Sequence, residues 1–251
     1  MAVSVNRTVQ NILISQPEPQ HKSPYARLEE KCDVSVDFEP FIEVEGVDVR
    51  EFRKSRVHIT DYQSVIFTSR NAMDHFFRIS GDLRLNMSQE TKYFCISEAI
   101  ALYLQKHIQY RKRKVFYGNG SIKEFKELLM KYKESSGRIL YPCSDVRKAH
   151  LPEFLAENGF DYSEAVLYRT VATDLAHVDL DAYDMLVFFS PSGVKSLFKN
   201  FPDFEQGDTS IATYGPTTSK IARSMGLRLD IEAPTEKARS MSMAIEHFLK
   251  E

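Results

Sequence analysis

The sequence predicts an α/β protein that is built from two parallel β-sheets. Short β-prone apolar runs alternate along the chain with segments of helical periodicity, which is the pattern of parallel α/β structure. Several runs, such as Val65–Phe67 and Leu186–Phe188, are continuously apolar, which favours strands covered by helices on both faces. Ten such runs exceed what one compact open sheet usually holds, so we expect two sheets of five strands each.

The predicted strands are bounded by turn residues and separated by helical segments. In chain order they are Asn11–Ser15, Val34–Pro40, Ser64–Ser69, Tyr93–Ser97, Val115–Tyr117, Arg138–Cys143, Ser163–Tyr168, Asp184–Ser190, Ser210–Tyr214 and Leu227–Ile231.

An internal repeat supports the division into two sheets. Val65–Met73 aligns without gaps on Leu186–Val194, and in both segments an apolar strand ends in a serine, Ser69 or Ser190, before a helix. The correspondence continues in later strand–turn–helix units and in one aromatic position. These further pairs are Phe77 with Phe198, Phe94–Ala101 with Ala212–Ile221, and Val115–Leu129 with Leu227–Phe248. Two copies of one α/β scaffold are therefore predicted.

Two extended segments indicate where the chain crosses between the copies. Phe38–Val44 and Ala165–Val171 are β-prone and of similar length. Two crossings mean that the middle of the chain is inserted into a domain built from both ends. We expect one domain over 1–40 and 172–251 and an inserted domain over 41–171. The alternative is that both segments are only outer strands of their sheets.

Composition excludes several classes of protein. The 251 residues are 43% hydrophobic and 27% charged, with a formal net charge of -2, which gives no general attraction to nucleic acid or to an anionic membrane. No apolar run is long enough to span a bilayer, and the polar start, Met1–Asn11, lacks the apolar core of a signal peptide. The three cysteines form no C-x-x-C pair, so we expect neither a disulfide framework nor a zinc site, and a cytoplasmic location.

The candidate ligand-binding residues lie where predicted strands lead into helices. Ligands of open parallel sheets bind at the carboxyl ends of the strands, and the unpaired N–H groups of helix starts favour anions. The junctions are Phe67–Asn71, Tyr141–Lys148, Phe188–Gly193 and Tyr214–Thr218. Four such helix starts on two lobes predict a site for a polyanion, whereas any one of them alone is more typical of ordinary N-capping.

Other kinds of site are not supported. The chain has no glycine-rich nucleotide motif, and Gly118–Ser121 is interpreted as a structural turn. The seven histidines show no metal-ligand spacing, and His150 is expected to be a surface residue. The basic run Lys106–Lys114 is expected to be solvated rather than to bind nucleic acid. No G-x-S-x-G motif marks Ser69 or Ser190 as a nucleophile.

Taken together, the ordered motifs resemble those of the uroporphyrinogen-III synthase family. Phe188–Gly193 and, 25 positions further on, Gly215–Thr218 are similar to the paired signatures of that family. Further segments resemble the family at its usual spacing: Val65–Ala72, Tyr141–Cys143 with Arg147 and Leu151–Pro152, Val166–Thr170, and Pro234–Thr235. Each motif is short, but the ordered set covers about Ile12 to Leu249.

The resemblance implies a fold and an activity. The fold would be two similar flavodoxin-like parallel-sheet lobes joined by a two-stranded β ladder. The activity would be the cyclisation of hydroxymethylbilane, a chain of four pyrroles with many carboxylates, to uroporphyrinogen III. Ring D is inverted, water is lost, and no metal or organic cofactor takes part. The bilane is the implied partner, and transient contact with the upstream bilane-forming enzyme is compatible with this role.

The junctions and the resemblance together give the expected site residues. Tyr168 matches a tyrosine implicated in the family's chemistry and is expected to donate a hydrogen bond to the departing hydroxyl. The expected substrate-binding residues are Thr68, Ser69, Arg70, Asn71, Ser97, Ser144, Arg147, Ser190, Ser192, Gly193, Tyr214, Gly215, Thr217 and Thr218.

Two segments depart from the family pattern. Ile96–Ala99 stands where the family has a small Gly/Thr-rich turn, and Glu98 would repel a substrate carboxylate, so that only Ser97 is kept there. Ser15–Pro17 follows the first strand without the arginine that many relatives carry nearby.

Two other functions fit the pattern of residues. One is a two-lobed, non-catalytic binding protein for an anionic small molecule, and the other is a flavodoxin-like nucleotide or flavin binder. We expect the protein to be a monomer without nucleic-acid or membrane partners.

Overall fold

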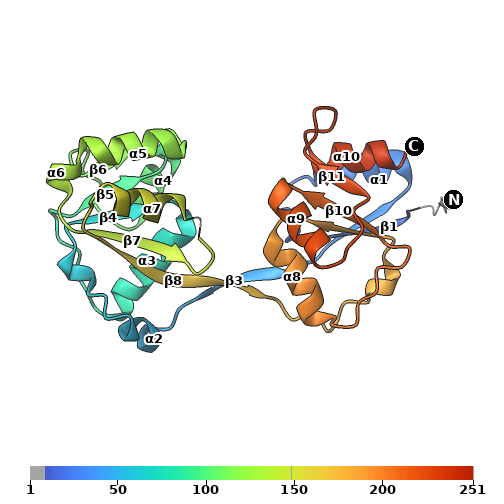
Figure 1. The fold of residues 1–251 in the computed structure, drawn as a ribbon, viewed down its shortest axis with the longest axis horizontal. Coiled ribbons are helices and arrows are strands. Elements are labelled where there is room, and N and C mark those ends of the chain that lie inside the picture. Colours follow the sequence, from blue (N-terminus) through green and yellow to red (C-terminus); the bar gives the residue numbers. More distant parts are fainter. Residues whose placement is uncertain (1–8, 148, 251) are drawn as a thin grey trace. The chain divides into compact units, whose positions relative to one another are not determined.

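The computed structural model describes residues 9–147 and 149–250, which form two compact units (Figure 1). The terminal unit combines Met1–Glu43 with Val171–Glu251, and the central unit is Val44–Thr170. Most of the polar start, Met1–Asn11, and Lys148 of the fourth junction lie outside the described residues. Among the described residues, no helix is long and apolar enough to cross a membrane.

The terminal unit contains a five-stranded parallel sheet with the order β11-β10-β9-β1-β2. Its strands are β1 (Asn11–Ile14), β2 (Ser35–Phe38), β9 (Met185–Phe188), β10 (Ser210–Tyr214) and β11 (Ile231–Ala233). Its helices are α1 (Ala26–Cys32), α8 (Pro191–Asn200), α9 (Pro216–Ser224) and α10 (Met241–Phe248), with a short 3₁₀ helix, η3 (Leu180–Ala182).

Alternate residues of this sheet pack into two cores, one on each face. Ile12 and Ile14 of β1 pack with residues of α1 and α10, whereas Leu13 between them packs with residues of α8 and α9. All three side chains are at most 2% exposed. Both faces are therefore covered by helices, which explains why the strand sequences are continuously apolar.

The central unit contains a six-stranded sheet with the order β3-β8-β7-β4-β5-β6. Its strands are β3 (Ile42–Gly46), β4 (Ser64–Phe67), β5 (Lys92–Cys95), β6 (Val115–Tyr117), β7 (Ile139–Ser144) and β8 (Tyr162–Ala172). Its helices are α2 (Val49–Lys54), α3 (Arg70–Asp82), α4 (Glu98–Tyr103), α5 (Ile122–Lys131), α6 (Lys133–Ser136) and α7 (His150–Glu157), with η1 (Ile59–Asp61) and η2 (Leu104–Lys106).

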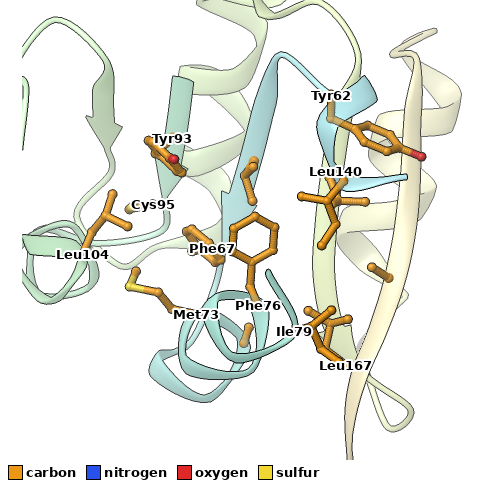
Figure 2. Packing of buried hydrophobic residues seen from close by; sticks show 14 of the residues in the cluster. Tyr62, Phe67, Met73, Phe76, Ile79, Tyr93, Cys95, Leu104, Leu140 and Leu167 are labelled. Carbon is orange, nitrogen blue, oxygen red and sulfur yellow. The ribbon is translucent and has the colours of Figure 1, made fainter. Parts of the chain in front are cut away.

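The central sheet also separates two cores. Figure 2 shows Phe67 of β4 against Met73 and Phe76 of α3, and the Phe67 and Phe76 rings meet edge to face at 5.4 Å. Ile66, the neighbour of Phe67 on the strand, belongs to the other core, which contains Phe125 of α5 and residues of α7. This packing holds the start of α3 at the carboxyl end of β4.

The two sheets have the same strand order once the chain connections are permuted. β9 and β4 occupy the middle, with β10 and β11 on one side of β9 matching β5 and β6 beside β4. On the other side β1 and β2 match β7 and β8. The strands that share the sequence repeat, β4 with β9 and β5 with β10, therefore occupy equivalent positions in their sheets.

The expectation of two five-stranded sheets is wrong for the central unit. Ile42–Gly46 forms an additional strand, β3, which lies beside β8 at the edge of the central sheet. Three of its five residues are exposed, so the continuous burial that identifies the inner strands is missing here. The segment Phe38–Val44, which overlaps this strand, was expected to be an extended crossing between the copies, with an outer strand as the alternative.

The last predicted strand, Leu227–Ile231, is also misplaced, since β11 begins only at Ile231. Leu227 instead terminates α9: Gly226 has a φ of +87°, and the N–H of Leu227 donates to the carbonyl of Ala222 at 3.1 Å. This is a Schellman motif, in which the apolar residue after the glycine packs back onto the helix.

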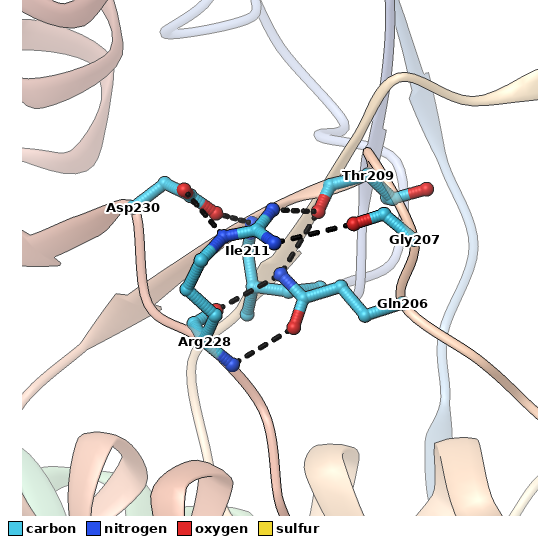
Figure 3. A network of polar contacts seen from close by, with 6 residues as sticks. All are labelled: Gln206, Gly207, Thr209, Ile211, Arg228 and Asp230. Atoms are coloured by element: carbon cyan, nitrogen blue, oxygen red, sulfur yellow. Dashed lines mark hydrogen bonds and ion pairs between the residues drawn. The ribbon is translucent and has the colours of Figure 1, made fainter. Parts of the chain in front are cut away.

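Side chains hold Arg228, the residue after Leu227, whereas Asp230 already bonds the neighbouring strand β10 through its N–H and the carbonyl of Ile211, at 2.9 Å (Figure 3). The Gln206 side chain bonds both the N–H and the carbonyl of Arg228, at 2.8 and 3.0 Å. Arg228 donates to the carbonyls of Gly207 and Thr209 at 3.2 Å each, and Asp230 accepts from the N–H of Ile211 at 2.9 Å. This network satisfies the polar groups that a strand would otherwise pair.

Candidate active site

The β4–α3 junction brings two hydroxyl groups together. Ser69 has an extended backbone, and its Oγ accepts the N–H of Ala72 at 3.0 Å, as an N-cap does. The same Oγ lies 3.1 Å from the hydroxyl of Tyr168 on β8, 99 positions away in sequence. Ser69 therefore begins the helix and also orients the expected catalytic tyrosine.

A register shift in the sheet sets the direction of Tyr168. β8 pairs with β7 so that Val166 lies opposite Cys143, but Tyr168 rather than Leu167 lies opposite Ser144. Leu167 is fully buried, whereas Tyr168 remains half-buried. Such bulges redirect side chains next to functional sites.

His75 of α3 supports the ring of Tyr168. The two rings stack with centroids 5.2 Å apart and an interplanar angle of 16°. Burial, reinforced by the charge of Arg78, lowers the pKa of His75, and the Nε–H of Arg78 donates to its Nδ1 at 3.3 Å. A Cβ on Gly46 would come within 2.9 Å of the imidazole, so this position of β3 must lack a side chain for the stack to form.

A pocket of about 460 Å³ opens at the carboxyl ends of β4, β5 and β7. Five expected site residues line it: Thr68, Ser69, Ser144, Arg147 and Tyr168. The other lining residues are Ile96, Gly120, Ile122, Tyr141, Cys143, Val146, His150 and Leu151.

The buried polar groups of this pocket are neutral at physiological pH. Burial raises the pKa of the Cys143 thiol to about 12, and the nearby carboxylate of Glu164 acts in the same direction. Burial also raises the pKa of Tyr141, and a hydrogen bond with Thr68 opposes that shift. Because neither group ionises near pH 7, the pocket offers hydrogen-bond donors rather than a thiolate or phenolate nucleophile.

At the junction that follows β7, the side chains of Ser144 and Arg147 already have partners within the protein. Arg147 forms an ion pair with Glu164, whose carboxylate also lies 4.0 Å from the Cys143 sulfur. The hydroxyl of Ser144 donates to the carbonyl of Val146 at 2.8 Å. His150, the first residue of α7, is exposed as expected and lines the same pocket.

Arg70 and Asn71 begin α3 and are exposed. The guanidinium of Arg70 lies over the ring of Tyr103, 5.1 Å from its centroid. The Tyr103 hydroxyl is itself held by both carboxylate oxygens of Asp74, at 3.0 and 2.9 Å. Arg70 therefore presents a positioned cation at the start of the helix.

The β5–α4 junction follows the capping pattern. Ser97 Oγ accepts the N–H of Ile100 at 3.4 Å. Glu98 accepts a hydrogen bond from the hydroxyl of Tyr117 at 3.2 Å, which raises the pKa of Tyr117. A carboxylate therefore stands in the first turn of α4, as the sequence indicates.

In the terminal unit, the β9–α8 junction repeats the geometry of β4–α3. Ser190 Oγ accepts the N–H of Gly193 at 3.0 Å, the same distance and the same helical position as in the Ser69 cap. A Cβ on Gly193 would meet its neighbours only at ordinary distances, the nearest being Ser190 Oγ at 3.4 Å. The protein's own packing therefore does not require a glycine here, although Gly193 is buried and Ser192 half-buried.

The β10–α9 junction differs from the others, because no side chain among the described residues caps its helix. The N-cap residue is Gly215, with a φ of +88° that favours glycine. Thr217 is exposed at the first turn and Thr218 is buried. The hydroxyl of Tyr214 donates to the carbonyl of Arg239 at 3.2 Å, and its ring stacks on Phe189 at 5.7 Å. Pro216 has no N–H and the N–H of Thr218 donates to the carbonyl of Gly215 at 3.1 Å, so in the first turn of α9 the N–H of Thr217 is the group left for a ligand among the described residues.

The expected site residues omit three residues at these junctions, although Tyr141 begins the predicted junction Tyr141–Lys148. Tyr141 and Gly120 line the central pocket, and Ser15, which is 8% exposed, lies next to the Ser190–Gly193 turn. Ser15 and Tyr141 lie on β1 and β7 or directly after them, and these strands are equivalent neighbours of β9 and β4. Knowledge of the strand order, rather than of any motif, would have identified them.

Metal chemistry has no evident centre in this part of the chain. Among residues 9–147 and 149–250, no group of three or more His, Cys, Asp or Glu side chains is arranged to hold a metal ion.

Comparison with known proteins decides the family. The family model described as uroporphyrinogen-III synthase HemD matches residues 23–242. The chain belongs to the uroporphyrinogen-III synthase family. A uroporphyrinogen-III synthase of Chlorobaculum parvum is 24% identical over 96% of this chain and the whole of that protein.

Two solved structures share the fold. The uroporphyrinogen-III synthetase of Helicobacter pylori is 19% identical with a TM-score of 0.58, covering 96% of this chain and 99% of that chain. A substituted variant of the Thermus thermophilus uroporphyrinogen III synthase is 17% identical with a TM-score of 0.54, at the same coverage. Family membership identifies the activity as that of a lyase in heme biosynthesis, as the motifs indicate. The fold is α/β with two predominantly parallel sheets.

Proposed function

We propose that this chain closes hydroxymethylbilane into uroporphyrinogen III with inversion of ring D, and that the Ser69–Tyr168 hydroxyl pair assists the first step. The single observation that carries this proposal is the 3.1 Å contact of the two hydroxyls at the mouth of a pocket whose buried groups are neutral. The family assigns the reaction, and the pair supplies a donor for it.

Proton counting explains what the pair provides. Ser69 Oγ already accepts the N–H of Ala72, and the two hydroxyls carry two protons between them. One proton is used in the bond between the hydroxyls, whichever is the donor. The other remains available to a ligand, so that either arrangement leaves one O–H donor for the bilane.

The chemistry then needs little more than a donor and correct positioning. The hydroxyl of ring A takes up the proton of the donor and leaves as water, and an azafulvene-type cation remains. Ring D attacks this cation through its substituted carbon, and the resulting spiro intermediate fragments. Ring D recloses inverted, and loss of a proton restores the pyrrole. Because the bilane also closes unaided to the unturned isomer, the protein must mainly hold it in the spiro-forming geometry.

Helix starts supply the binding groups for the substrate carboxylates. We propose that α3, α8 and α9 each bind a carboxylate, with Arg70 adding a cation and Gly215 leaving α9 without a side-chain cap. Charge-assisted hydrogen bonds of this kind contribute about 1.5–3 kcal/mol each. Arg147, which is paired with Glu164, is the weakest of the proposed contacts.

The remaining proposals concern organisation. We propose two similar flavodoxin-like lobes with boundaries at 1–40 and 172–251 against 41–171, joined by a two-stranded β ladder. The pairing of β3 with β8 supports the ladder, and the matching strand orders support the likeness of the lobes. The three free cysteines support a cytoplasmic location. We also propose a monomer that meets the upstream bilane-forming enzyme only transiently.

The test is an isomer assay. Hydroxymethylbilane is generated in situ, the protein is added at once, and the isomers III and I are separated after oxidation. We expect mainly isomer III. A ratio equal to that in buffer alone would refute the proposal and would favour the non-catalytic anion-binding protein, an alternative that the family does not support.

A further inference from the structure

A second pocket of the central unit lies at the amino ends of the strands, opposite to the carboxyl ends where the first pocket opens. Its volume is about 520 Å³, and it opens beside the amino ends of β5 and β6, where Thr91 precedes β5 and Lys114 precedes β6. The proposed reaction uses the carboxyl ends of these strands. The second pocket is therefore separate from the site described above.

The lining of this pocket combines positive charge with an apolar wall. It includes Lys106, Arg111 and Lys114, and no Asp or Glu is found among its described lining residues. The apolar wall is formed by Leu85, Met87 and Ile108, together with Phe77.

The cations are held in place without being fully neutralised. Arg111 donates to the neutral amide oxygen of Gln89 at 2.7 Å. Lys106 lies over the ring of Tyr103 at 4.4 Å, and among the described residues neither Lys106 nor Arg111 forms an ion pair. Lys114 does pair with Glu90, whose side chain is 72% exposed. Positive charge therefore remains in excess at the pocket.

The aromatic side of the pocket is also ordered. His107 stacks on Phe77 with ring centroids 4.5 Å apart, and its Nε2 lies 3.0 Å from a carboxylate oxygen of Asp74. The rings are nearly parallel, at 5°. A flat apolar body can pack against such a wall while its anionic groups reach the cations.

We propose that this pocket binds a small molecule that carries two or more oxyanions on an apolar or aromatic body. The basic run Lys106–Lys114, which the catalytic proposal does not use, supplies the anion-binding side chains. The oxyanions are carboxylates or phosphates. The inference does not rest on the proposed reaction, because none of its residues belongs to the catalytic pocket.

Calorimetric titration tests the proposal and distinguishes the two kinds of oxyanion. The probes are benzene-1,3,5-tricarboxylate and 1,3-phenylene bisphosphate, with 1,3-bis(aminomethyl)benzene as a cation of similar shape. We expect saturable one-to-one binding of at least one anionic probe, weakened by salt, and none of the amine. The absence of saturable binding by both anions would overturn the proposal.

Two double variants separate the pocket from the general charge of the segment. Lys106→Gln with Arg111→Gln removes two lining cations and should weaken probe binding about tenfold or more. Lys112→Gln with Arg113→Gln removes the same charge from exposed neighbours outside the lining and should leave affinity nearly unchanged. Equal weakening by both would show diffuse charge attraction and would contradict the proposal.

A third variant fills the pocket while keeping every cation. Gly81 on α3 lines the pocket, and a Cβ there would meet nothing within 4 Å. Gly81→Leu should therefore fold normally, with an unchanged or higher melting temperature, and should abolish probe binding. Wild-type affinity in this folded variant would show that the probe binds elsewhere. Its isomer III production should match that of the wild type, which keeps this test independent of the catalytic one.

Discussion

The two units begin their equivalent helices differently. α3 and α8 follow matching strands, and each starts with a serine that caps the third helical N–H at 3.0 Å. The next pair differs, because α4 has the Ser97 cap and an acidic Glu98, whereas α9 starts at an uncapped glycine. Among the described residues, Ser69 of the central unit contacts a tyrosine hydroxyl, that of Tyr168, and Ser190 of the terminal unit does not.

The two copies share their serine caps and differ in the groups around them. A serine cap is a local feature that both copies keep because the helix needs it. The differences lie in what is added to the cap or removed from it: a hydroxyl partner in the central unit and an open helix start in the terminal unit. We interpret the central unit as the source of the proton donor and α9 as a helix start that offers the N–H of Thr217 to an anion.

Tyr168→Phe should have the largest effect. Loss of the phenolic hydroxyl breaks the pair and leaves the Ser69 hydroxyl without the partner that orients it, so turnover should fall about 100-fold, the scale observed when one preorganised donor is lost. The rate of isomer III formation is measured by stopped assay and chromatography. Tyr162→Phe makes the same change on the same strand, where the hydroxyl bonds the carbonyl of Pro152, and should keep near-normal turnover. Equal rates in the two variants would remove Tyr168 from the mechanism.

Thr217→Asp should stabilise the fold slightly but weaken substrate binding. A carboxylate at the open start of α9 interacts favourably with the helix dipole and should raise the melting temperature slightly. The same charge repels a substrate carboxylate, so KM should rise about tenfold. Thr217→Asn, which is neutral and similar in size, is the control and should leave KM nearly unchanged. An unchanged KM in the aspartate variant would mean that α9 does not bind the bilane.

Ser69→Ala and Ser190→Ala should lower stability by similar amounts but lower turnover by different amounts. Each variant loses one N-cap, which costs about 1 kcal/mol of unfolding free energy in urea titrations. Only Ser69→Ala also releases Tyr168, so it should lower turnover several-fold more than Ser190→Ala does. A loss of turnover in Ser190→Ala as large as in Ser69→Ala would show that the Tyr168 contact has no kinetic role.

The smallest expected effect is a pH dependence that is confined to the central unit. The pKa of His75 is lowered in the folded protein, so the unfolded chain takes up a proton first as the pH falls. The stability that comes from the neutral imidazole is present above the unfolded pKa of about 6.5 and is lost below it. Unfolding free energies at about pH 7.5 and pH 5.5 measure this loss.

His75→Ser provides the comparison with the terminal unit, because Ser196 is the aligned residue on α8. The variant should be less stable than the wild type at neutral pH and should show a flatter pH profile. A profile as steep as that of the wild type would assign the titration to another group.

Local chemistry was readable from sequence because it spans few residues. The caps of α3 and α8 join Ser69 to Ala72 and Ser190 to Gly193, only three positions apart, and a serine before an apolar helix predicts them. The strands with continuous burial, such as β4 and β9, were found in the same way. The repeat was visible because both copies keep the same local pattern.

Long-range features required the folded chain. β3 overlaps the β-prone segment Phe38–Val44, but its place in the central sheet depends on pairing with β8, and Leu227 has the sequence of a strand start but ends a helix. The contact of Ser69 with Tyr168 depends on the order of β4, β7 and β8 and on a one-residue register shift. Sequence determined which residues begin helices, because capping is set by neighbours in the chain. Tertiary structure decided which of them meet, because strand order and register depend on packing between distant segments.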